Sequence, residues 1–110
     1  MSQIEQEIVV YETQSGKLPF WDWLMGLKDV KGRSIIQARI ERVRLGNFGD
    51  CRTVGEGVQE LRIKFGPGYR VYFGRDGQRL VILLCGGDKS RQQKDIVAAK
   101  ALWKEYQNAD

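Results

Sequence analysis

Histidine is absent from the 110-residue chain. This absence removes the side chain that most often acts as a general base near neutral pH and most often binds transition metals. Cysteine is scarce: Cys51 and Cys85 lie far apart and outside any C-x-x-C spacing, so the sequence suggests neither a disulfide framework nor a zinc site. We therefore expect any chemistry to proceed without a metal or a cofactor, on other side chains.

Long apolar runs are also absent. The longest covers residues 80–85, far short of the roughly 20 residues that span a bilayer. The first residues include Glu5 and Glu7 and contain no signal-peptide core. A hydrophobic content of 42% in 110 residues is enough for one core. We expect a single domain over residues 1–110, located in the cytoplasm and without membrane contact.

Positive charge is concentrated in the middle of the chain. The net charge is +4, and residues 31–79 carry eleven basic against five acidic side chains, whereas residues 1–30 have an acidic excess. Such clustering is typical of proteins that bind the phosphate backbone of nucleic acids. Basic clusters also form ordinary solvated faces or docking sites for acidic proteins, and charge alone does not decide between these alternatives.

The hydrophobic periodicity predicts an α+β domain with the order βααβββα. The expected elements are a strand at 8–11, helices from residue 19 and after residue 32, strands at 58–65, 69–73 and 79–85, and a final helix capped by Asp88 or Ser90. The three later strands should form an antiparallel meander packed against the helices. Asp76-Gly77 indicates a two-residue hairpin, and Gly86-Gly87 should end the last strand.

The first hairpin of this meander gathers positive charge on one face. Closing it symmetrically about Pro67 places Lys64 opposite Arg70 and Arg62 opposite Tyr72. Facing cations repel one another, and an anionic ligand would relieve that repulsion. Guanidinium groups fit phosphate oxygens and stabilise the transition state of phosphodiester cleavage, while Tyr72 offers proton transfer or base stacking. Alternatively, these side chains are only the solvated side of an amphipathic hairpin.

The strand at 79–85 is apolar on both faces, so it should be covered on both. We expect Val81 and Leu83 beside Arg70, which makes the cationic face a partly walled cleft or a groove for a partner. Candidate RNA-binding side chains lie around it. They are Lys89 and Arg91, near the start of the last helix, and Arg39 and Arg42 on the second helix. For the two helix arginines, a charged outer face is the alternative.

Three motifs together resemble the addiction-module killer branch of the RelE/ParE toxin superfamily, the HigB/RelE-like and phage-derived toxins. They are the Gly-Tyr-Arg turn at 68–70, the apolar strand at 80–84 and the Gly-Asp-Lys-Ser loop at 87–90. The resemblance implies a RelE-like βααβββα fold and a toxin of a type II toxin–antitoxin pair. Such toxins are mRNA interferases: they cleave mRNA without metal, in many relatives on the ribosome. A cognate antitoxin, commonly a helix-turn-helix DNA-binding protein, neutralises them.

The resemblance also implies roles for individual residues. Arg70 corresponds to the residue that binds the phosphate and the transition state, Arg62 and Lys64 to basic residues of the preceding strand, and Lys89 and Arg91 to the basic loop after the final strand. Several relatives have a tyrosine or histidine near the C-terminus as acid or base. This chain lacks histidine, and Tyr106 falls at an expected core position, so Tyr72 is the remaining candidate for proton transfer.

Two other functions stay open. One is a ParE-like inhibitor that binds DNA gyrase and cleaves nothing, and the other is a non-enzymatic nucleic-acid-binding module. The convergence of Arg62, Lys64 and Arg70 favours cleavage, because a gyrase inhibitor does not need three cations around one phosphate.

Overall fold

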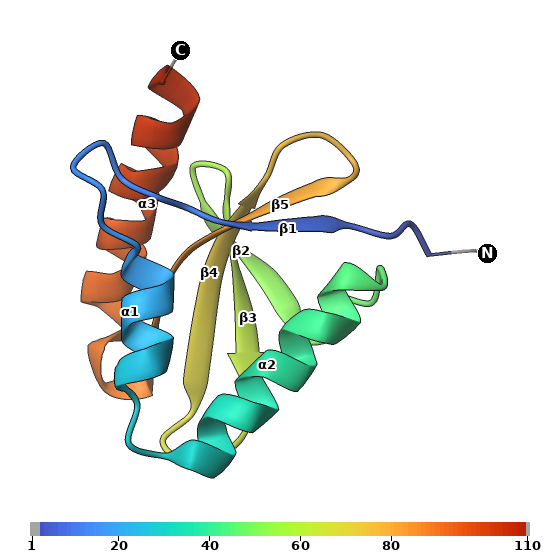
Figure 1. Cartoon of the computed structure of the whole chain (residues 1–110), viewed down its shortest axis with the longest axis vertical. Coiled ribbons are helices and arrows are strands. Elements are labelled where there is room, and N and C mark those ends of the chain that lie inside the picture. The colour runs from blue at the N-terminus through green and yellow to red at the C-terminus, as the bar shows by residue number, and fades with distance from the viewer. Residues whose placement is uncertain (1–2, 110) are drawn as a thin grey trace.

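The computed structural model describes residues 3–109 as a five-stranded mixed sheet with three α-helices and one short 3₁₀ helix (Figure 1). The elements are β1 (Glu7–Val10), α1 (Pro19–Gly26), α2 (Val30–Arg44), β2 (Cys51–Gly55), β3 (Val58–Ile63), β4 (Tyr69–Arg75), β5 (Leu80–Asp88), the 3₁₀ helix η1 (Lys89–Arg91) and α3 (Gln92–Asn108). The predicted α+β class is confirmed. No helix within the described residues is long and apolar enough to cross a membrane.

The strands follow the spatial order β1-β5-β4-β3-β2. Strands β2 to β5 form an antiparallel meander, and β1 pairs with β5 in parallel. The meander is confirmed, but it has one strand more than predicted, so the predicted order βααβββα is wrong at β2. This edge strand contains the polar residues Arg52 and Thr53 and is exposed or half-buried throughout. It therefore lacks the apolar alternation by which a strand is recognised in a sequence.

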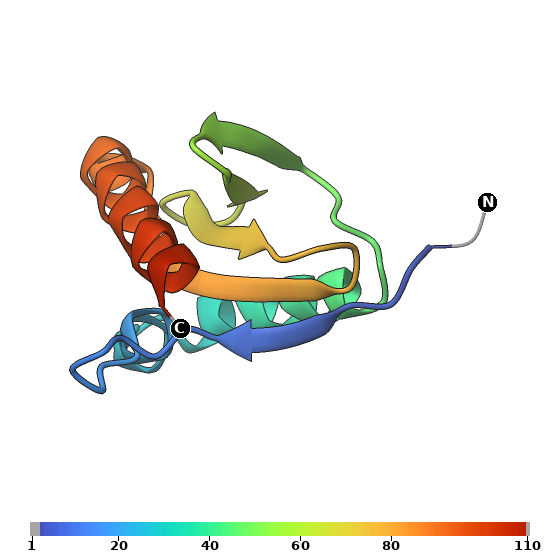
Figure 2. The same cartoon turned by 90° about the horizontal axis from the view of Figure 1, so that it is seen from above.

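Helices cover both faces of the sheet. Helices α1 and α2 pack against one face, where Phe20, Leu24 and Ile36 join the core, and α3 packs against the other face through Ile96 and Trp103. Figure 2 shows α3 on the opposite side of the sheet from α1 and α2. The expectation that the last strand is covered on both faces is confirmed, since residues 81–85 are all buried.

Helix α2 begins at Val30 and not after Gly32 as predicted. The Asp29 side chain accepts a hydrogen bond from the backbone N–H of Gly32 at 2.8 Å, which satisfies one free donor of the first turn. The same carboxylate accepts a hydrogen bond from the Tyr69 hydroxyl at 2.7 Å. Asp29 thus ties the start of α2 to the start of β4.

The predicted register of the hairpin between β3 and β4 is wrong by two residues. Arg62 pairs with Arg70, and Tyr72 pairs with Glu60. The turn is wider than a symmetric closure about Pro67 because Gly68, with a φ of 83°, donates its N–H to the Phe65 carbonyl at 3.0 Å. An even shift keeps each side chain on its expected face while changing its neighbour.

The hairpin between β4 and β5 also differs from the prediction. Arg75 pairs with Val81, which leaves five residues between these partners where the predicted turn leaves two, so Val81 and Leu83 lie on the α1/α2 face and not beside Arg70. An odd change in register moves side chains to the other face. Gly86 and Gly87 do not end the strand. Side chains of Trp23 and Asp95 occupy the places where their Cβ atoms would lie.

Candidate nucleic-acid interface

A hollow of about 340 Å³ lies at the turn where β3 ends and β4 begins. We call it the cationic hollow. Its charged lining consists of Arg62, Lys64, Arg70 and Lys89, and the turn at 66–68 closes one side. Four side chains that the sequence singled out therefore surround one space. Lys64 and Lys89 are exposed, whereas Arg62 and Arg70 are half-buried at the strand ends.

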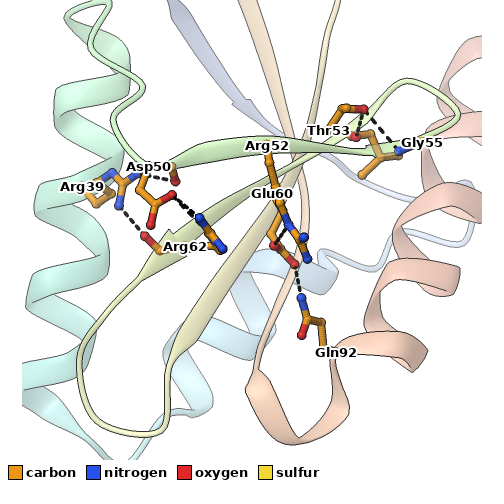
Figure 3. A network of polar contacts seen from close by, with 9 residues as sticks. Arg39, Asp50, Arg52, Thr53, Gly55, Glu60, Arg62 and Gln92 are labelled. Atoms are coloured by element: carbon orange, nitrogen blue, oxygen red, sulfur yellow. Dashed lines mark hydrogen bonds and ion pairs between the residues drawn. The ribbon is translucent and has the colours of Figure 1, made fainter.

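Arg62 and Arg70 stand directly opposite each other in the sheet. Like charges in this position repel one another. Asp50 offsets part of that repulsion, because its Oδ1 accepts hydrogen bonds from Nη2 and Nε of Arg62 at 2.8 and 3.1 Å (Figure 3). The hydrogen bond from Arg62 holds the pKa of Asp50 below its usual value. The Arg62 side chain keeps 38% of its surface exposed, so its guanidinium is oriented and still accessible.

Arg70 has no comparable partner at its Nε. This atom is buried and donates no hydrogen bond to any of the described residues. A buried donor without an acceptor costs roughly 1–3 kcal/mol. The Arg70 side chain lines the cationic hollow, so an anionic oxygen bound there would lie beside its guanidinium. Gly87 lies beside Arg70 on β5 and contributes no side chain. Of the four cations, Arg70 has the strongest unmet need for an acceptor.

The structure does not place Tyr72 on an open face. Its side chain is fully buried beneath α3, and its hydroxyl has no hydrogen-bond partner within residues 3–109. Burial, together with the neighbouring Glu60 carboxylate, raises the pKa of Tyr72 well above its usual value. The expected exposure of Tyr72 is therefore wrong. The strand pattern showed which face it occupies, but not that α3 covers that face.

Arg39 is not available to RNA either. Only 7% of its surface is exposed. Its guanidinium donates to the backbone carbonyls of Arg62, Phe48 and Asp50 at 2.7 to 2.9 Å, as Figure 3 shows in part. Arg39 thus fastens α2 to the segment that carries Asp50. Its burial fits neither the predicted contact with RNA nor the alternative of a charged outer face. Arg42, on the same helix, is exposed.

Glu60 is a member of this region that sequence reasoning did not single out. It is fully buried, and its carboxylate accepts hydrogen bonds from Arg52 and Gln92, each at 2.9 Å (Figure 3). Burial acts to raise the pKa of Glu60, but these hydrogen bonds outweigh it and leave that pKa lowered. Because Gln92 begins α3, Glu60 anchors the helix next to Lys89. A glutamate in an alternating strand carries no local signal of burial.

Arg91 lies outside the cationic hollow. It is exposed and lines a neighbouring hollow with Trp23 and Asp95. Among the described residues, no group of three or more histidine, cysteine, aspartate or glutamate side chains lies close enough together to hold a metal ion. Cys51 is half-buried and Cys85 is buried, and both are free thiols.

Comparison with known proteins places the chain in a family. The model of the phage-derived protein Gp49-like family (DUF891) matches residues 22–104. An uncharacterized protein of Haemophilus influenzae is 53% identical over 88 residues, which cover 80% of this chain and 89% of the relative. The matched segment includes α2, the whole meander and most of α3, and with them every residue of the cationic hollow. The chain belongs to the Gp49-like family of phage-derived proteins.

Proposed function

We propose that this protein is the toxin of a type II toxin–antitoxin pair, related to the RelE/ParE superfamily, and that it cleaves mRNA on the ribosome without a metal ion. Membership in the Gp49-like family is consistent with a toxin-like function in general. The observation that carries the proposal is the cationic hollow, in which Arg62, Lys64, Arg70 and Lys89 surround one space.

An RNA phosphodiester fits the chemistry of the cationic hollow. Two guanidinium groups offer forked donors for phosphate oxygens, and the two exposed ammonium groups add charge without fixed geometry. The bound phosphate lies beside the Arg70 guanidinium, which lines the cationic hollow. It also reduces the repulsion between Arg62 and Arg70, which face each other across the sheet. Binding an anion therefore reduces an unfavourable interaction of the free protein.

The same arrangement favours cleavage over simple binding. In the proposed step the ribose 2′-oxygen loses its proton and attacks the adjacent phosphorus, and the bond from phosphorus to the 5′-oxygen breaks. The 5′-oxygen takes up a proton, which leaves a 2′,3′-cyclic phosphate and a 5′-hydroxyl. Negative charge on the phosphorane oxygens increases in the transition state, where Arg70 and Arg62 stabilise it most. Asp50 keeps the Arg62 guanidinium oriented for this contact.

The proposed partners follow from this function. The substrate is mRNA in the ribosome, and cleavage there stops translation. A cognate antitoxin of the helix-turn-helix DNA-binding type neutralises the toxin, as the family resemblance implies.

Inducible expression in bacteria tests the proposal, with growth and the 5′ ends of messages as readouts. Wild-type protein should arrest growth and produce discrete new 5′-hydroxyl ends, and Arg70→Ala should remove both. Arg79→Ala is the matched control, because Arg79 is an exposed arginine at the opposite end of β5 from Asp88. It should arrest growth as the wild type does.

Other outcomes would identify the alternatives. Growth arrest with intact messages and accumulating DNA breaks would contradict RNA cleavage and point to gyrase. Growth arrest by a folded Arg70→Ala variant would remove Arg70 from the proposed mechanism. Absence of any growth effect would leave a basic binding module.

A further inference from the structure

A second hollow, of about 310 Å³, adjoins the cationic hollow at the end of β5. We call it the edge hollow. It is lined by Trp23, Gly86, Gly87, Asp88, Arg91 and Asp95. The two hollows lie close together, since Gly87 is the strand partner of Arg70 and Asp88 directly precedes Lys89. This closeness is the geometric basis for asking whether the edge hollow takes a base next to a phosphate bound beside Arg70.

The edge hollow is open because β1 does not extend to the end of β5. Strand β1 pairs with β5 only along residues 80–83, whereas β5 continues to Asp88. The Trp23 side chain packs over Gly86, where a Cβ atom would collide with its ring. The indole is half-buried and meets the Tyr69 ring edge-on at 6.1 Å between centroids. A partly accessible aromatic ring thus forms one wall.

The opposite wall carries an acceptor without a donor. Asp95 is half-buried against Gly87, and its carboxylate accepts no hydrogen bond from residues 3–109. Desolvation raises the pKa of Asp95, although the positive charge of Arg91 opposes the shift. The Oδ1 atom of Asp88 accepts a hydrogen bond from the backbone N–H of Ser90 at 2.9 Å. The edge hollow therefore combines carboxylate acceptors, a guanidinium group and an aromatic ring.

Guanine matches these groups better than the other bases. Its Watson–Crick edge has adjacent N–H donors at N1 and N2, which suit a carboxylate, and its O6 and N7 are the acceptors that arginine prefers. Its ring can stack on an indole. Uracil has carbonyl oxygens on both sides of a single N–H group, so it can donate only one hydrogen bond to a carboxylate, and its oxygens repel the carboxylate.

We propose that the edge hollow binds a guanine base adjacent to the phosphodiester held in the cationic hollow, with Asp95 and Arg91 as the residues that select it. This inference rests on the proposed function. It adds a base preference next to the cleaved bond, which phosphate contacts alone cannot provide.

Calorimetric binding of deoxydinucleotides tests the inference without cleavage, since these probes lack the 2′-hydroxyl. The probes are GpT, TpG and TpT. The wild-type protein should bind one of the two guanine-containing probes at least about tenfold more tightly than TpT. Asp95→Asn should remove most of that preference, because its amide NH₂ faces the guanine donors. Arg91→Gln, a change at an exposed residue, should also reduce it.

Asp22→Asn is the matched control, because Asp22 is exposed and, like Asp95, lies in the first turn of a helix. It should keep the wild-type preference. Equal affinity of the wild type for all three probes would overturn the guanine site, as would an unchanged preference in both Asp95→Asn and Arg91→Gln. Arg70→Ala should lower the affinity for all three probes to the same extent. If Arg70→Ala lowers the affinity for none of the probes, the result contradicts the phosphate site of the proposed function, whatever the base preference.

Discussion

The arginine side chains of this protein differ in what their guanidinium groups contact. Arg39 is buried and binds backbone carbonyls, Arg62 is held by a carboxylate, and Arg70 has a buried Nε without a partner. Their chemistry is identical, so their roles follow from position. A guanidinium whose donors are satisfied stabilises the fold, and one whose donors are free is available to a ligand.

Arg39→Ala should lower the free energy of unfolding by about 2–4 kcal/mol, because it removes a buried side chain together with its three hydrogen bonds to backbone carbonyls. Arg42→Ala changes an exposed arginine on the same helix and should alter it by less than about 0.5 kcal/mol. Urea denaturation of the two variants measures the difference. Equal effects would contradict the structural role assigned to Arg39.

Glu60 should make stability depend on pH. Its pKa is lowered in the folded protein. A lowered pKa contributes stability that is fully present above the ordinary value of 4.5 and is lost as the pH falls through the folded value. Glu60→Gln should therefore reduce stability at pH 7 by about 1–3 kcal/mol and flatten the loss in acid. Glu12→Gln, at an exposed site, should leave the acid profile of the wild type unchanged.

Denaturation midpoints measured from pH 7 down to pH 3 check this prediction. Parallel acid profiles for Glu60→Gln and the wild type would show that the carboxylate is not the group responsible.

The close contact between α3 and the sheet requires glycine at a position on β4. A Cβ atom on Gly74 of β4 would overlap the Trp103 ring of α3. Gly74→Ala should therefore destabilise the protein by about 1–3 kcal/mol. Gly26→Ala is the comparison, because nothing lies near Gly26 at the end of α1. That variant should be neutral or slightly stabilised in thermal unfolding, and a similar loss in both would argue against close packing at Trp103.

The sequence predicted those elements whose pattern is local. Helix α1 begins at Pro19 as expected, and the alternation in β3 and β4 assigns each side chain to its face. Strand β2 escaped prediction because an edge strand needs no apolar alternation. The faces of β5 depended on the length of its hairpin loop. With Arg75 paired to Val81, five residues lie between the partners where the predicted turn has two, and this odd change exchanged the faces of β5.

The residues of the candidate site were also predictable only in part. Arg62, Lys64, Arg70 and Lys89 were grouped by their spacing, and they surround one hollow. Tyr72 and Arg39 were misjudged because burial depends on packing between distant segments. Tyr72 lies under α3, and Arg39 lies under the loop before β2. The edge hollow was not foreseen, since it arises where β1 stops short of the end of β5.

The molecule as a whole covers the central strands of its sheet on both faces, whereas the edge strand β2 stays exposed or half-buried. Helices α1 and α2 cover one face and α3 the other, as Figures 1 and 2 show, so the ends of the strands are where charged side chains can meet a ligand. Both hollows lie at one such end. The single-domain organisation stays a prediction of the sequence. The central proposal, cleavage of mRNA at the cationic hollow, depends on this arrangement of the strand ends.

The most direct test of that proposal is the chemistry of the RNA ends. Purified wild-type, Arg70→Ala and Arg79→Ala proteins would each be added to ribosomes translating a defined message, and the fragments would be analysed. We predict 2′,3′-cyclic phosphate and 5′-hydroxyl ends with the wild type and Arg79→Ala, and a loss of at least about a hundredfold in their rate of formation with Arg70→Ala. An intact message with the wild type, or equal cleavage by a folded Arg70→Ala protein, would contradict the account.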